Sequence, residues 1–203
     1  GAHQVIDIFR DTTDVFIVGI LDDNPSKRDK TIMGYNILGG IDKIEDLFAE
    51  NIFTHLIVAV SGNIKFRKSI YNRCQEIGIP LINAIDKSCT IRSNVTIGQG
   101  NVICGNTYIG SFTQIGDNNF ISASTSIDHH NIWHSHISIG PSCSTSGLVE
   151  IKSGCRLGMG VLFEPDIVIE ENCTIASGAT ITSSISCNTL IRVKSSLRRS
   201  VIE

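Results

Sequence analysis

A six-residue repeat of apolar residues runs through the second half of the chain. Nineteen positions spaced six apart, from Ile85 to Val193, are almost all large and aliphatic. An α-helix repeats about every 3.6 residues and an ordinary strand about every two, so neither keeps this spacing over such a length. A hexapeptide-repeat β-helix does keep it, because three short strands make each triangular turn and each strand sends one large side chain inward. The repeat predicts a left-handed parallel β-helix over residues 85–193.

A second row of residues follows the same repeat. Four residues after the large positions come small or branched ones, among them Cys89, Val95, Asn101, Thr107, Thr113, Cys143, Val149, Cys155, Val161, Ile167, Cys173 and Ala179. Glycine often follows the large residue, as a tight corner requires. This row is expected to face the interior as well.

The composition is that of a soluble globular protein. Charged residues make up 18% of the 203 residues and the net charge is −3, which provides no basic surface for nucleic acid. No apolar run reaches the roughly 18 residues that a membrane helix needs, and no signal peptide is visible. We therefore expect neither nucleic-acid binding nor membrane insertion.

The seven cysteines do not suggest disulfides. Four of them (Cys89, Cys143, Cys155 and Cys173) fall in the small inward row and Cys187 falls in the large one, where they act as compact apolar residues. Free buried thiols are typical of a reducing compartment, so a cytoplasmic protein is expected.

Residues 1–84 have a different pattern, in which strands alternate with helices. Strands are expected at 15–21, 55–60 and 79–83, and helices at 41–50 and Ile64–Ile77. This alternation predicts a small parallel, Rossmann-like α/β sheet. The expected division is 1–84 for this domain, 85–193 for the β-helix and 194–203 for a C-terminal tail. Gly1 is followed at once by a helical pattern, so a preceding glycine-rich turn and first strand are expected to be missing.

The combination of these parts resembles a known family. A strand ending in Asp22-Asp23 and a hexapeptide β-helix bearing Asp128-His129-His130 are joined through Asn83-Ala84-Ile85. Nearly the whole chain resembles the bacterial nucleotide-sugar N-acetyltransferases that act on 4-amino-4,6-dideoxy sugars, and the related sialic acid O-acetyltransferases, within the hexapeptide-repeat acyltransferases. The resemblance implies a homotrimer that binds a nucleotide sugar in the N-terminal domain and acetyl-CoA in a groove between neighbouring prisms.

The resemblance also implies the site residues. His129 matches the general base, with His130 as the alternative, although the family usually has Asp or Glu at position 130. Contacts to the nucleotide sugar are expected from His3, Asp22 and Asp23, and the Ser61-Gly62 amides precede a helix and could face a phosphate. Two candidates match the family's histidine near the acetyl-CoA thioester: His136 by the sequence Ser-His-Ile-Ser around it, and Ser138 by its position in the repeat. Contacts to acetyl-CoA are also expected from Gly147, Met159 and Ser177. The family's usual Gly-x-Pro-Ala-Lys ending is absent.

Acetyl transfer needs a base for the proton of the attacking group and a donor for the developing oxyanion. An imidazole titrating near neutrality suits the base, and strand alternation should point Asp128 away from it. His129, His130, His134 and His136 are close in sequence, but no carboxylate or thiolate completes a familiar ligand spacing, so no metal is expected. Trp133 either fills the core or lines the cofactor groove. The alternatives left open are O-acetylation of a sialic or related nonulosonic acid, a metal-dependent hydratase, and a binding trimer without activity.

Overall fold

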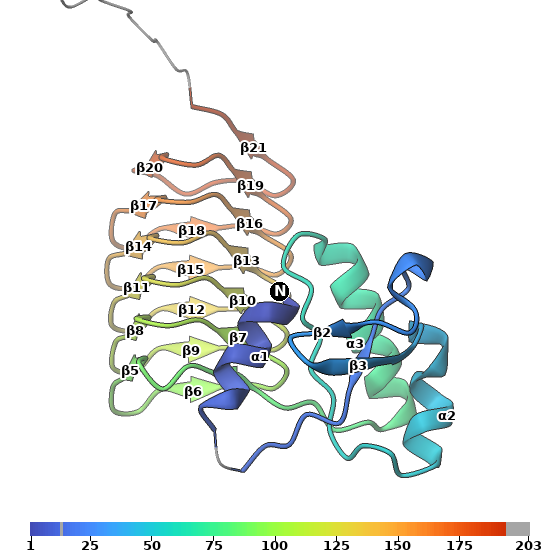
Figure 1. Cartoon of the computed structure of the whole chain (residues 1–203). Helices are drawn as coiled ribbons and strands as arrows, with labels where there is room; N and C mark the ends of the chain where they lie inside the picture. Colours follow the sequence, from blue (N-terminus) through green and yellow to red (C-terminus); the bar gives the residue numbers. More distant parts are fainter. Residues whose placement is uncertain (13, 194–203) are drawn as a thin grey trace, which may run out of the picture.

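The computed structural model describes residues 1–12 and 14–193. The tail predicted at 194–203 lies outside the described residues. The chain forms a small α/β domain beside a tall three-sided prism (Figure 1).

Two-residue strands build the prism. They are β4 (Ala84–Ile85), β5 (Thr90–Ile91), β6 (Thr96–Ile97), β7 (Val102–Ile103), β8 (Tyr108–Ile109), β9 (Gln114–Ile115), β10 (Phe120–Ile121), β11 (Ser126–Ile127), β12 (Ile132–Trp133), β13 (Ser138–Ile139), β14 (Ser144–Thr145), β15 (Glu150–Ile151), β16 (Arg156–Leu157), β17 (Leu162–Phe163), β18 (Val168–Ile169), β19 (Thr174–Ile175), β20 (Thr180–Ile181) and β21 (Leu190–Ile191). In the described part of the chain they make three parallel sheets, ordered β21-β19-β16-β13-β10-β7-β4, β20-β17-β14-β11-β8-β5 and β18-β15-β12-β9-β6. The predicted left-handed β-helix is confirmed.

Both predicted inward rows are buried between residues 101 and 181, whereas Ile91 in the first coil is 42% exposed. Successive large residues stack in register, so that Ile121 lies between Ile103 and Ile139, and the small row fills the space beside them. Trp133 is 1% exposed and pairs with Ile115 and Ile151, so it fills the core. A continuous apolar interior explains how strands of two residues can be stable.

The repeat shifts by two residues near its end, which corrects one prediction. Ile185 bridges to Ile169 and Ile191 pairs with Ile175, where the unbroken repeat required Cys187 and Val193. Both of those residues are exposed, so Cys187 is not a core residue. At this shorter corner the Ser184 hydroxyl accepts a hydrogen bond from the Val168 amide (3.0 Å). The shift buries isoleucine in place of cysteine, which removes more apolar surface from water.

The N-terminal domain contains α1 (Ala2–Arg10), β1 (Ile20–Leu21), the 3-10 turn η1 (Pro25–Lys27), β2 (Thr31–Ile32), β3 (Tyr35–Gly39), η2 (Ile41–Lys43), α2 (Ile44–Ala49) and α3 (Ile64–Ile77). The sheet order is β1-β3-β2, with β3 parallel to β1 and antiparallel to β2, so the sheet is smaller and less parallel than predicted. The strand expected at 55–60 is reduced to a bridge between Leu56 and Leu81. The α3 prediction is confirmed: Asn63 caps its first turn and Gly78, with φ of 79°, ends it.

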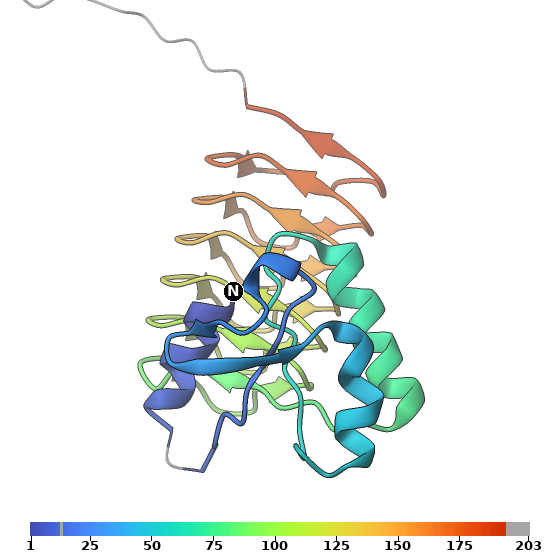
Figure 2. The same cartoon turned by 45° about the vertical axis from the view of Figure 1, so that its right-hand side comes forward.

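Two helices dock this domain against one sheet of the prism (Figure 2). Val5 and Phe9 of α1 pack on Val102 and Phe120. From α3, the buried Arg67 guanidinium donates to the carbonyls of Asn118 (3.1 Å), Ile137 (2.9 Å) and Val60 (2.9 Å) and to the Ser138 hydroxyl (2.8 Å). These bonds hold the segment before α3 beside β13. No helix in the described residues is both long and apolar enough to cross a membrane.

Candidate active site

The two predicted base residues form an exposed corner between β11 and β12. The Nδ1 atoms of His129 and His130 are 3.1 Å apart, and their rings are nearly perpendicular (85°). His130 has a left-handed φ of 56° and stacks on Phe112, with ring centroids 4.9 Å apart. The structure therefore brings His129 and His130 together on an apolar support.

Gly147, on the next coil, lies against the His129 ring. A β-carbon built on Gly147 would be 2.5 Å from Cε1 and 2.8 Å from Nε2 of His129, closer than any real contact. The place that His129 occupies thus depends on a residue without a side chain one coil away. The predicted acetyl-CoA contact at Gly147 and the predicted base at His129 are neighbours.

Asp128 does not orient the His129 imidazole. Its Oδ1 accepts a hydrogen bond from the His129 backbone amide (2.7 Å), as expected from the alternation of side chains. The histidine that does pair with a carboxylate is His134, whose Nε2 lies 2.8 Å from Glu150 Oε1. The hydrogen bond from His134, followed by that from Lys152, lowers the pKa of Glu150.

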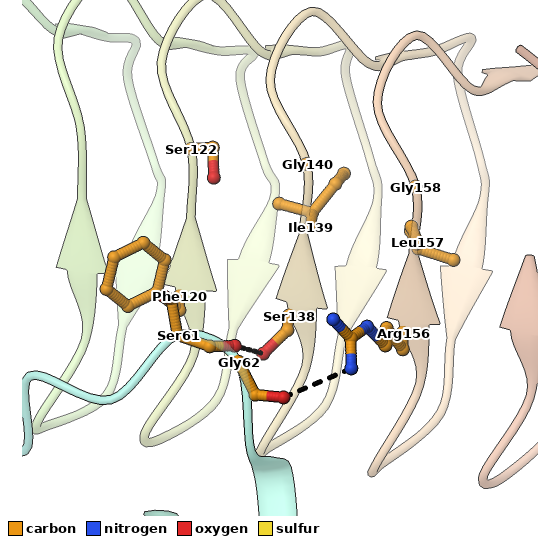
Figure 3. A pocket seen from close by; sticks show the side chains of 10 residues that line it. All are labelled: Ser61, Gly62, Phe120, Ser122, Ser138, Ile139, Gly140, Arg156, Leu157 and Gly158. Carbon is orange, nitrogen blue, oxygen red and sulfur yellow. Dashed lines mark hydrogen bonds between the residues drawn. The ribbon is translucent and has the colours of Figure 1, made fainter. Parts of the chain in front are cut away.

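A second feature is a cavity of about 230 Å³ between the 61–62 segment and the sheet that contains β10, β13 and β16. Figure 3 shows how two bonds tie this segment to the sheet: Ser138 donates to the Ser61 carbonyl (3.2 Å) and Arg156 donates to the Gly62 carbonyl (3.1 Å). The cavity lies at the start of α3. Ser61, Gly62 and Ser138, predicted separately, are thus brought together.

Sequence reasoning missed Phe120, Ser122 and Arg156 in this lining. A signal for two of them was present. Phe120, Ser138 and Arg156 are the first residues of β10, β13 and β16, paired in register on successive coils. Because one coil is 18 residues long, the position of Ser138 predicts that Phe120 and Arg156 lie beside it on the two adjacent coils.

His136 lies apart from the cavity lining, in the interface between the domains. Its buried ring meets the edge of Tyr71 (centroids 5.2 Å apart), and its Nδ1 is 2.9 Å from Asn118 Nδ2. Burial, followed by the charges of Lys68 and Arg67, lowers the pKa of His136 to about 4. A neutral imidazole therefore helps to join the two domains.

Met159 and Ser177 lie at the corner beyond the cavity. The Met159 side chain is exposed, and the Met159 amide donates to the Ser177 hydroxyl (3.1 Å). Gly158, which lines the cavity, leaves room for Ser177 on the next coil. Both predicted cofactor contacts are thus near the cavity but not part of its lining.

Asp22 and Asp23 lie at the carboxyl end of β1. Asp22 accepts from Lys27 Nζ (2.6 Å) and from the Asn24 amide (2.9 Å), and these bonds, the lysine first, lower its pKa. Asp23 Oδ1 accepts from the Ile41 amide (2.7 Å), next to Gly40.

Gly40 lines a second cavity, of about 340 Å³, together with Arg28 and Lys43. Its lining shares no residue with the cavity at Ser61 and Gly62. His3 is exposed in the first turn of α1.

The His129 corner and the Ser138 cavity belong to different sides of the prism. His129 follows β11, in the sheet that runs along the left edge of Figure 1, whereas β10, β13 and β16 face the α/β domain. Within the described residues no group of three or more His, Cys, Asp and Glu side chains could hold a metal ion. One chain therefore presents the predicted base, His129, and a cavity that it does not itself bring together.

Comparison with known proteins matches both parts of the chain. Residues 2–74 match the PglD N-terminal domain, and residues 148–183 match the bacterial transferase hexapeptide (six repeats).

Similar folds occur in solved acetyltransferase structures. PerB from Caulobacter crescentus, in complex with CoA and GDP-perosamine, is 22% identical with a TM-score of 0.86, over 93% of this chain and 87% of that one. The acetyltransferase domain of PglB from Neisseria gonorrhoeae, in complex with acetyl coenzyme A, is 21% identical with a TM-score of 0.82, over 92% and 89%. WeeI from Acinetobacter baumannii is 18% identical with a TM-score of 0.80, over 94% and 91%. The chain thus joins a region similar to the PglD N-terminal domain to a region similar to bacterial transferase hexapeptide repeats, and its fold is that of the solved acetyltransferases, in agreement with the family that its sequence resembles.

Proposed function

We propose that this protein is an acetyl-CoA-dependent N-acetyltransferase that acetylates the amino group of a nucleotide-activated amino-deoxy sugar for bacterial surface glycans. The observation that carries the proposal is the shared architecture, over nearly the whole chain, with PerB in its complex with CoA and GDP-perosamine. An exposed histidine pair and a cavity beside the N-terminal domain agree with a base and a binding site.

In the proposed reaction the sugar amine attacks the thioester carbonyl, the C–S bond breaks, and CoA leaves as the thiol. His129 takes the proton of the amine as the new C–N bond forms and passes it to the sulfur of the departing CoA. His129 Nδ1 faces His130 Nδ1, so Nε2 is the atom available to accept that proton. His130 stands where the family usually has a carboxylate, and as a second imidazole it fixes the orientation of the His129 ring.

The substrate's nucleotide is proposed to lie on the N-terminal domain. The carboxylate of Asp23 and the cavity at Gly40 suit contacts to a nucleoside, since ligands of open α/β sheets bind at the carboxyl ends of strands. The start of α3 after Gly62 suits a phosphate. Acetyl-CoA is proposed to reach Ser138, Met159 and Ser177.

A homotrimer would bring the two separated features together. The His129 corner is flanked by Phe112 and Leu148, both exposed and both with φ near 60°, where bulky residues are uncommon. The two sheets that meet at this corner carry three more exposed apolar residues, Tyr108, Ile132 and Leu162. Packing this apolar surface against the next prism in a closed threefold ring would cover it and bring His129 to a neighbour's cavity.

Light scattering tests this assembly. The wild-type protein should be a trimer at micromolar concentration, and Leu148→Asp should weaken the trimer and lower activity together. A stable wild-type monomer with full activity would refute the shared site. All seven cysteines are free thiols, which supports placing the enzyme in the cytoplasm.

The function is tested with 4-amino sugars, each linked to one of the nucleotides UDP, dTDP, GDP or CMP. One of them should raise the melting temperature by binding the native state, and should release CoA from acetyl-CoA. The acetylated product should carry an amide. Acetylation of a sialic acid hydroxyl instead would assign the chain to O-acetylation, and binding of acetyl-CoA with no transfer to any acceptor would refute the proposal.

A further inference from the structure

One stack of inward-facing residues lies beneath the His129 corner. It comprises the residues that precede β6, β9, β12, β15 and β18, namely Val95, Thr113, Asn131, Val149 and Ile167. We call it the corner stack. Its apolar members are typical of a β-helix core, whereas Thr113 and Asn131 are polar although they are as deeply buried (0% and 0% exposed).

Both polar atoms of the Asn131 side chain make hydrogen bonds. Its Nδ2 donates to the carbonyls of Asp128 (2.8 Å), Ser146 (2.9 Å) and, at a longer distance, His129 (3.3 Å). Its Oδ1 accepts from Trp133 Nε1 (3.4 Å). The Thr113 hydroxyl donates to the Asp128 carbonyl as well (2.9 Å).

These acceptors belong to the two corners that place the imidazole. Asp128 and His129 form the corner that carries the ring, and Ser146 precedes Gly147, over which the ring lies. One amide group thus links the backbone of the base to the backbone of the surface beneath it. A valine in the same place, as at positions 95 and 149, would fill the core without making that link.

We propose that Asn131, assisted by Thr113, is a positioning residue for His129. It holds the 128–129 corner at a fixed distance from the 146–147 corner, so that the imidazole keeps the place it needs over Gly147. The effect on rate rests on the proposed function of His129 as the base. The effect on the position of the ring does not depend on that function.

The test compares Asn131→Val with a matched control, Asn101→Val. Asn101 belongs to the same small inward row, is equally buried, and its Nδ2 donates to the Gly116 carbonyl (2.9 Å) at a different corner. Both variants lose buried hydrogen bonds, so both should melt at lower temperature. Only Asn131→Val should shift the imidazole NMR signals of His129, and only it should lower kcat, by about 10- to 100-fold with little change in KM.

A second variant keeps the test decisive if Asn131→Val folds poorly. Asn131→Thr retains one hydroxyl donor. The Thr113 hydroxyl reaches the carbonyl 15 residues further along the chain, and the equivalent acceptor for position 131 is the Ser146 carbonyl. Asn131→Thr should recover part of the kcat and move the His129 signals back toward those of the wild type. Unchanged His129 signals in Asn131→Val would overturn the proposal, and so would an equal loss of kcat in Asn101→Val. Where Asn131→Val does not fold, a loss of kcat in Asn131→Thr no larger than that in Asn101→Val would overturn it. A wild-type protein without acetyl transfer would refute the proposed function alone, because the NMR comparison needs no substrate.

Discussion

Gly147→Ala should damage activity while leaving the fold intact. The added β-carbon would meet His129 Cε1 at 2.5 Å, where ordinary van der Waals contact begins at 3.4 Å, so the ring must move by about 0.9 Å or rotate away. The backbone of Gly147 is not in the left-handed region, so alanine fits it without strain. Alanine also restricts the unfolded chain, and the free energy of unfolding should stay within about 1 kcal/mol of the wild type.

A misplacement of about 1 Å in a reacting group can cost on the order of 10²-fold in rate, which corresponds to about 2.7 kcal/mol of activation free energy. We therefore expect kcat to fall by about 10- to 100-fold with an unchanged melting temperature. The assay is CoA release with the best amino-sugar acceptor, repeated in a His129→Ala background. If Gly147 acts only through the ring, the substitution should have no further effect there. Wild-type kcat in the single variant, or an equal loss in both backgrounds, would refute the reasoning.

Ile109→Ala should lower the free energy of unfolding by about 2–5 kcal/mol, whereas Ile91→Ala, in the same row but 42% exposed, should cost clearly less; equal losses in denaturant titrations would contradict the assigned packing. Arg67→Ala leaves several buried carbonyls without a donor and should cost about 3 kcal/mol or more, while Arg73→Ala on the same helix breaks a surface pair with Glu45 and should cost about 1 kcal/mol or less; similar costs would argue against a role in domain docking. Because the pKa of His136 is lowered from 6.5 to about 4, the unfolded chain binds a proton between these values that the folded chain does not, so stability should be full above about pH 6.5 and fall as the pH drops toward 4. His136→Asn, which suits the left-handed φ of 64°, should flatten this dependence, and an unchanged slope would contradict it.

Most of the prism could be predicted from the sequence because its cause is local. Each large residue every six positions fills one side of a triangle, so the spacing determines the strands, their register and the buried rows. The shift after Ile181 could not be predicted in the same way, because apolar residues are available in both frames: Cys187 and Val193 in one, Ile185 and Ile191 in the other. The choice depends on how well each pair packs on the coil below.

The candidate site was predictable to a lesser extent. His129 and His130 stand out in the sequence, but the dependence of the ring on Gly147 comes from two coils stacking 18 residues apart. The bonds of Arg67 to the prism join segments about 50 to 70 residues apart and leave no trace in a periodic pattern. Likewise, the local sequence favoured His136 as a cofactor contact, whereas position in the repeat favoured Ser138. Only the folded chain shows that Ser138 lines the cavity while His136 joins the domains.

The central claim is that His129 is the general base of acetyl transfer to an amino sugar. The most direct measurement is kcat for His129→Ala beside His130→Ala, with acetyl-CoA and the best nucleotide-sugar acceptor. Neither side chain belongs to the inward rows, so both variants should keep the wild-type melting temperature and bind acetyl-CoA. We predict that kcat falls by about 10²–10⁴-fold in His129→Ala and by clearly less in His130→Ala. A larger loss in His130→Ala, or near wild-type rates in both variants, would contradict the claim.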